Sequence, residues 1–67
     1  MSLYKFLTTY IGNGQLILVY CYGSAIIDKE RCRDVLNNDK YKEFMKKDVS
    51  RILSTNSIPD TIVIYIE

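Results

Sequence analysis

A chain of 67 residues holds one domain, residues 1–67, and a core this small leaves much of the surface in contact with water. Hydrophobic residues make up 48% of the chain and charged residues 25%, which is typical of a globular protein and excludes a disordered one. Nine basic and eight acidic residues give a net charge of +1, which argues against a dedicated DNA-wrapping protein.

Two strands are predicted at the front of the chain, at residues 4–11 and 16–22, joined through Gly12-Asn13-Gly14. Asn-Gly is the strongest short hairpin signal, because its residues accept positive φ angles. Loops of two and of three residues give different registers, and both stay open. A sheet with one wet face alternates apolar and polar residues, and neither predicted strand does so. Both faces of this hairpin are therefore expected to be apolar.

Helical patterns follow in the middle of the chain. Asp28 is a plausible N-cap for a short helix over residues 29–36. Asn37-Asn38-Asp39 then breaks or kinks the helix, with Asn38 or Asp39 capping the second helical segment. Apolar side chains fall on one helical arc over residues 41–53, and the polar run 54–57 with Pro59 ends this second helix. Whether the helix is one segment or two stays open.

A last strand, Thr61–Ile66, completes a small two-layer α+β sandwich. The expected order is strand, strand, helix (one piece or broken) and strand, with a three-stranded, mainly antiparallel sheet. The preferred arrangement places the last strand beside the first and antiparallel to it. The alternative places it beside the second strand and parallel.

One helical layer covers only one face of such a sheet, so the other apolar face is expected to bind a partner. A closed two-fold homodimer is the commonest solution. Aromatic rings are predicted to supply the contact area on this face: Tyr4, Phe6, Tyr10, Tyr20 and Tyr22. The competing interpretation is that the two helical segments lie on opposite sides of the sheet and cover both faces, or that strand twist hides most of the open face.

Three basic residues of the second helix, Lys46, Lys47 and Arg51, are predicted to steer an acidic target, unless they belong to an ordinary solvated face. Asp48 falls inside the apolar arc of that helix, where an unpaired buried acid would cost several kcal/mol. One expectation is that it reaches water, or pairs with Arg51 or a tyrosine hydroxyl. The other is that it makes a polar contact in a pocket or across a dimer.

No catalytic, metal or phosphate motif stands out, so neither enzyme activity nor a cofactor is expected. The chain has no histidine, and Cys21 and Cys32 are expected to be free buried thiols rather than a disulfide or a zinc site. The longest apolar stretch, 16–27, is interrupted and too short to span a bilayer. A cytoplasmic protein that does not enter membranes is expected.

The function expected from these features is that of a small non-enzymatic protein-protein interaction module, a homodimer that also binds another protein. Abundant Lys, Ile, Asn and Tyr suggest an accessory or inhibitor protein of a phage or mobile element, acting in the host cytoplasm on a host protein. One alternative is a nucleic-acid-binding module that uses the tyrosines and helix lysines. A further alternative is a small-ligand binder at a dimer seam.

Overall fold

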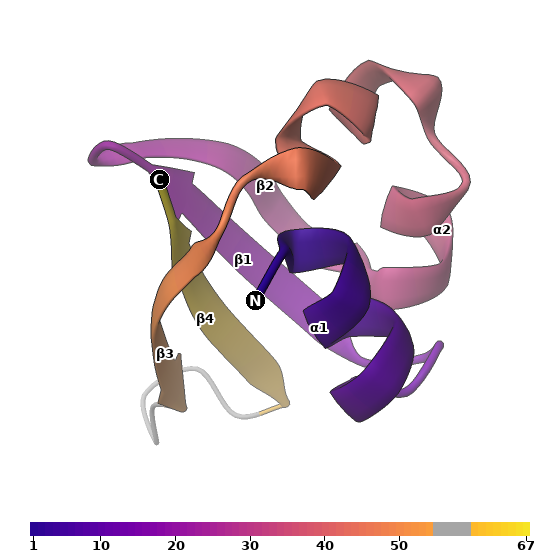
Figure 1. The fold of residues 1–67 in the computed structure, drawn as a ribbon. Coiled ribbons are helices and arrows are strands. Elements are labelled where there is room, and N and C mark those ends of the chain that lie inside the picture. The colour runs from indigo at the N-terminus through magenta and orange to yellow at the C-terminus, as the bar shows by residue number, and fades with distance from the viewer. Residues whose placement is uncertain (55–59) are drawn as a thin grey trace.

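The computed structural model describes residues 1–54 and 60–67, and within them shows one four-stranded sheet with helical segments on one side (Figure 1). The small α+β class is confirmed, and the count of three strands is wrong. In chain order the elements are α1 (Leu3–Tyr10), β1 (Leu16–Cys21), β2 (Ser24–Arg31), α2 (Cys32–Leu36), the 3-10 helix η1 (Asp39–Lys46), β3 (Val49–Ser54) and β4 (Thr61–Ile66).

The segment predicted as the first strand, residues 4–11, is helix α1 instead. Ser2 caps it, with its hydroxyl accepting a hydrogen bond of 3.1 Å from the amide of Lys5. Leu3 and Leu7 lie one helical turn apart on the same face, and both are fully buried. The predicted front hairpin is therefore wrong, and Gly12-Asn13-Gly14 joins a helix to a strand.

The actual hairpin joins β1 to β2, the next strand along the chain. Its turn is Tyr22-Gly23, with φ angles of 51° and 84°, and positive φ at both central residues is what a tight two-residue hairpin turn needs. Strand β2 runs on to Arg31, so the predicted helix over 29–36 begins only at Cys32. Asp28 lies within β2 and caps no helix.

The predicted second helix over 41–53 is also wrong in its second half. Asn38 caps η1 as expected, its side chain accepting from the amide of Lys40 at 3.1 Å. After Lys46 the chain leaves the helix and forms β3, which pairs antiparallel with β4. The stop signals predicted at 54–57 and Pro59 fall on 55–59, outside the described residues, apart from Ser54, the last residue of β3.

The order of strands across the sheet is β2-β1-β4-β3. Strand β4 is confirmed where it was expected, and it lies beside β1 and parallel to it. The alternative arrangement is therefore the correct one. The preferred antiparallel neighbour of β4, the segment 4–11, is not a strand at all.

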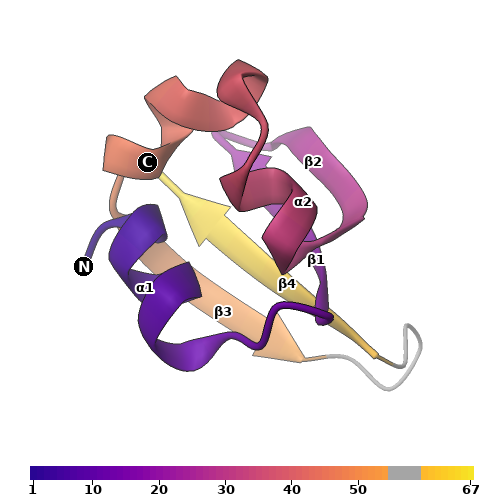
Figure 2. The same cartoon turned by 90° about the vertical axis from the view of Figure 1, so that its right-hand side faces the viewer.

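The helical layer, formed by α1, α2 and η1, packs on a single face of the sheet (Figure 2). The side chains that fill the space between the two layers are Leu3, Leu7, Ile17, Val19, Cys21, Ile27, Cys32, Val35, Tyr41, Ile64 and Ile66. This leaves the opposite face of the sheet without a helix among the described residues, as the sequence predicted.

Candidate protein-binding surface

The side of the sheet that faces away from the helices is called the outer face here. Ile17, Val19 and Ile64 point to the helical layer and are fully buried. Since successive side chains of a strand alternate between faces, and cross-strand partners share a face, the residues between them lie on the other side. The outer face is formed by Leu16, Leu18, Tyr20, Arg51, Leu53, Thr61, Val63 and Tyr65.

A row of stacked side chains crosses this outer face. The rings of Tyr20 in β1 and Tyr65 in β4 are register partners, stacked with centroids 5.2 Å apart and planes 16° from parallel. Arg51 in β3 lies opposite Tyr65, and its guanidinium carbon is 4.7 Å from the ring centroid. On the other flank, Tyr20 pairs with Ala25 of β2. A cation and two rings are thus held in one line by the register of the sheet.

The middle of the outer face is already closed within the single chain. Leu18 and Val63, which are register partners, are only 7% and 5% exposed although no helix covers them. Larger neighbours on the same face flank them, among them Leu16 and the two stacked tyrosines. The accessible apolar surface is therefore narrower than the sequence suggested, and consists of the half-buried ring row together with Leu53, which is 37% exposed.

The five aromatic residues predicted to share a sheet face do not share it. Tyr4, Phe6 and Tyr10 belong to α1, where Tyr4 and Tyr10 are exposed and the rings of Phe6 and Tyr10 lie 5.8 Å apart. Tyr22 is in the hairpin turn and 77% exposed. Among them only Tyr20 lies in the stacked row. The predicted grouping is wrong because the first segment is helical.

The three basic residues predicted to share a helix face come from three different places. Lys46 ends η1, Lys47 follows it, and Arg51 lies in β3. Two of them contact tyrosine rings, since the Nζ of Lys47 is 5.7 Å from the ring centroid of Tyr22 and Arg51 lies over Tyr65. The structure thus interleaves cations with rings in a way that the predicted helix did not.

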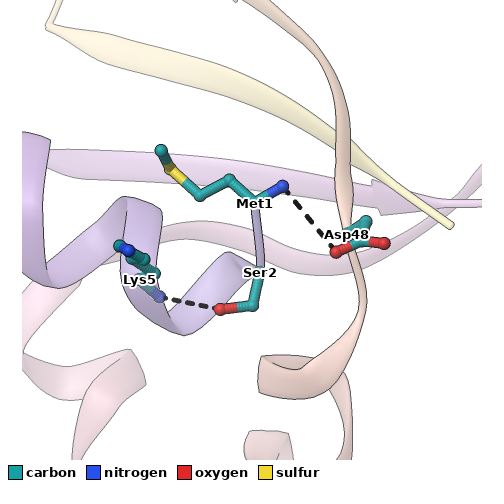
Figure 3. Close-up of polar contacts among 4 residues, drawn as sticks. All are labelled: Met1, Ser2, Lys5 and Asp48. Atoms are coloured by element: carbon teal, nitrogen blue, oxygen red, sulfur yellow. Dashed lines mark hydrogen bonds and ion pairs between the residues drawn. The ribbon is translucent and has the colours of Figure 1, made fainter.

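Asp48 lies in the connection between η1 and β3, where it forms an isolated antiparallel bridge with Ser2. Its carboxylate is 74% exposed and lies 3.8 Å from the amino group of Met1 (Figure 3). The expectation that this acid reaches water is confirmed, and the helical arc that made it look buried does not exist.

A cavity of about 620 Å³ opens on the helical side of the molecule, between α1, α2 and η1. Its apolar lining includes Tyr4, Val35, Leu36 and Met45, and Lys42 and Lys46 also line it. Because it lies on the helical side and the ring row on the outer face, the two features are separate.

Buried polar chemistry is concentrated at Tyr41, which joins η1 to β2. The Tyr41 hydroxyl donates a hydrogen bond to the carboxylate of Glu30, and this bond, with burial and the negative charge of Glu30, raises the pKa of Tyr41 to about 12. Cys21 and Cys32 are both free and buried, as expected, and burial raises the pKa of the Cys32 thiol. Tyr41, Cys21 and Cys32 are thus buried between the layers, whereas the carboxylate of Glu30 is half-buried.

Tyr65 and Leu53 contribute to the candidate binding surface but were not among the predicted site residues. Tyr65 has opposite parity to Ile62, Ile64 and Ile66 in the predicted last strand, so alternation alone places it on the other face. Leu53 was hidden by its assignment to a helix, and only the pairing of β3 with β4 moves it to this surface.

Within residues 1–54 and 60–67 there is no helix with the length and apolar character needed to cross a bilayer. The same residues contain no group of three or more His, Cys, Asp or Glu side chains placed to hold a metal ion. Comparison of the chain with protein-family models, with curated proteins and with solved structures finds no match.

Proposed function

We propose that this chain is a non-enzymatic protein-protein interaction module that binds its target through the outer face of the sheet. The observation that carries the proposal is the row Tyr20, Tyr65 and Arg51 on a face that no described helix covers. Tyrosine and arginine are enriched at the centres of protein interfaces relative to the rest of the protein surface.

The row has the properties of a preorganised contact. Stacking fixes the rings of Tyr20 and Tyr65 before any partner arrives, so binding costs little side-chain entropy. The half-buried phenols present apolar area together with a hydroxyl, which suits a contact that is partly wet. Arg51 adds a charge that favours an acidic group on the target.

The test is capture of target proteins from extracts of the native host by immobilised wild-type chain and by two outer-face variants. Tyr65→Ser and Arg51→Glu should each reduce capture of the target by about tenfold or more, since interface tyrosines and arginines commonly contribute over 1 kcal/mol. Tyr10→Ser, an exposed ring on α1, is the matched control and should capture as wild type does. Equal capture by all four proteins would contradict the proposal.

Single-stranded nucleic acid is a second candidate, favoured by the two cations beside tyrosine rings. Rings stack on bases, and nearby Lys and Arg neutralise phosphates. Arg51 at Tyr65 and Lys47 at Tyr22 supply that combination. Fluorescence anisotropy with a mixed-sequence oligonucleotide decides between the two, because nucleic-acid binding should weaken steeply with added salt and should be lost in Arg51→Glu.

The expected homodimer and the accessory or inhibitor role are part of the same proposal, since both rest on protein contacts. The helical-side cavity remains the place for a small ligand if native mass spectrometry finds one bound to the purified chain. A ligand seated there would leave the outer face free.

A further inference from the structure

The sheet has two edge strands, and they are built differently. At the β2 edge four consecutive charged residues follow one another, Asp28-Lys29-Glu30-Arg31. Lys29 has a φ of 51°, and the pairing of β2 with β1 shifts register between Ile17 and Val19. Charges and bulges are devices that prevent an edge strand from pairing with another chain.

The β3 edge has less of this protection, since it carries one charged residue, Arg51, and one register shift, between Val49 and Arg51. Ile52 and Leu53 are 45% and 37% exposed, and they point to opposite faces of the sheet because their partners are Ile64 and Val63. The N-terminal segment covers only the start of this edge, where the amide of Val49 donates to the carbonyl of Met1 at 2.8 Å. At Ile52 and Leu53 the edge is therefore apolar on both faces of the sheet.

The backbone groups at this edge can be assigned from the hydrogen-bond pattern. Asp48 and Glu67 exchange two backbone bonds, of 3.2 and 3.0 Å, which makes them a hydrogen-bonded pair. Bonding alternates along an antiparallel strand, so Tyr65 and Val63 also direct their amides and carbonyls to β3. Their partners Arg51 and Leu53 bond inward, and Ile52 between them directs its N–H and C=O away from the sheet.

We propose that β3 pairs antiparallel with β3 of a second copy of this chain, about a two-fold axis at Ile52. In this register the outward N–H and C=O of each Ile52 bond to the other Ile52. On the outer face Arg51 of each copy lies beside Leu53 of the other.

Other registers are worse for identifiable reasons. A shift that centres the axis on Arg51 places two guanidinium groups opposite each other, and like charges across strands are destabilising. A shift by a single residue pairs Ile52 with a residue whose N–H and C=O already bond to β4. It also places side chains from different faces of the sheet opposite each other. Compared with these two shifts, the register centred on Ile52 covers both exposed apolar side chains and keeps the two arginines apart.

The dimer joins two four-stranded sheets into one and places the two outer faces side by side. This inference deepens the homodimer that the proposed function includes, and it concerns the edge of the sheet and not the outer face that binds the target. Either can hold without the other. If both hold, the target meets two ring rows on one continuous surface.

Disulfide trapping tests the register directly. Paired residues at a hydrogen-bonded site have Cα atoms about 5.5 Å apart, within the range that a disulfide spans. Ile52→Cys should therefore form a covalent dimer under mild oxidation. The controls are Asp28→Cys, which lies on the β2 edge, and Leu53→Cys, which in this register lies opposite Arg51 of the other copy and not opposite its own equivalent. Both should cross-link at least tenfold more slowly. The native thiols are buried in all three variants.

Analytical ultracentrifugation tests the affinity of the dimer without a covalent bond between the copies, by comparing wild type with Ile52→Lys. This variant should weaken the dimer at least tenfold, whereas Asp28→Ala should not change it, and circular dichroism should show both folded. A wild-type chain that stays monomeric at submillimolar concentration overturns the proposal, as does Ile52→Cys cross-linking no faster than either control. If Ile52→Lys loses the dimer but still captures the target, dimerisation through the edge and target binding through the outer face are separate properties.

Discussion

Removing one hydroxyl, in the substitution Tyr41→Phe, should destabilise this protein measurably. Tyr41 is 3% exposed, and its hydroxyl donates to the half-buried carboxylate of Glu30. The bond ties η1 to β2, two elements that α2 separates along the chain. Without it the Glu30 carboxylate loses a hydrogen-bond donor in a partly buried site.

The magnitude follows from the charge of the acceptor. Hydrogen bonds to charged groups contribute about 1.5–3 kcal/mol, more than neutral ones, so Tyr41→Phe should lower the free energy of unfolding by about 2 kcal/mol at neutral pH. Phenylalanine keeps the ring and fills the same space, so no cavity term is added. Urea denaturation followed by circular dichroism measures the difference.

The pH dependence gives an independent check with a definite sign. The folded-state pKa of Tyr41 is raised to about 12, above its ordinary value near 10. The stabilisation is therefore complete below pH 10 and is lost as the pH rises from 10 through 12, by about 2–3 kcal/mol. Wild type should lose this much stability across that window relative to Tyr41→Phe. Equal stabilities at pH 7, or parallel curves above pH 10, would show that the bond to Glu30 does not form.

Three further outcomes are expected. Leu7→Ala should lower the free energy of unfolding by about 2–5 kcal/mol and lower the melting temperature, because Leu7 is fully buried. Tyr10→Ala on the same helix should change the free energy of unfolding by less than about 0.5 kcal/mol. Equal effects of the two substitutions would contradict the burial of Leu7. Ser2→Ala should cost about 1 kcal/mol by removing the N-cap of α1, a loss that Ser2→Asp should largely prevent. Cys32 should react with an aromatic disulfide reagent only as fast as the chain opens, since burial raises its pKa and shields it, and fast labelling of native protein would refute this.

The first segment shows how an apolar spacing can be misread. Leu3, Leu7 and Ile11 recur every fourth residue, and this spacing fits one face of a strand as well as one face of a helix. Ser2, which caps the helix, was the local signal that separates the two, but the Asn-Gly pair suggested a hairpin. Tyr22-Gly23, a weaker turn signal in sequence, makes the hairpin instead.

The second half of the predicted long helix failed for a different reason. Residues 49–53 carry apolar side chains that fit a helical arc, and their strand conformation is fixed by pairing with β4, a contact with residues distant in sequence. The local warning was Asp48, an acid inside an otherwise apolar arc. Its actual position, exposed in a connection, removes the conflict.

What the sequence predicted well is the imbalance between apolar strands and helical cover. The continuous apolar runs in β1 and β4 are typical of central strands, and both are central in the sheet. The stacked row could not be predicted, because it needs the parallel pairing of Tyr20 with Tyr65 and the position of β3 beside them. The candidate site was therefore not predicted, because the parallel pairing of strands that forms it was the less favoured alternative.

Photo-cross-linking in living cells of the source organism tests the proposed contact surface most directly. A photoreactive phenylalanine analogue at position 65 places the reactive group in the ring row, and the same analogue at position 10 places it on the exposed side of α1. If the outer face binds the target, the analogue at position 65 should give a discrete protein adduct. The analogue at position 10 should give no adduct of the same molecular mass. The same adduct from both positions, or from position 10 alone, would contradict it.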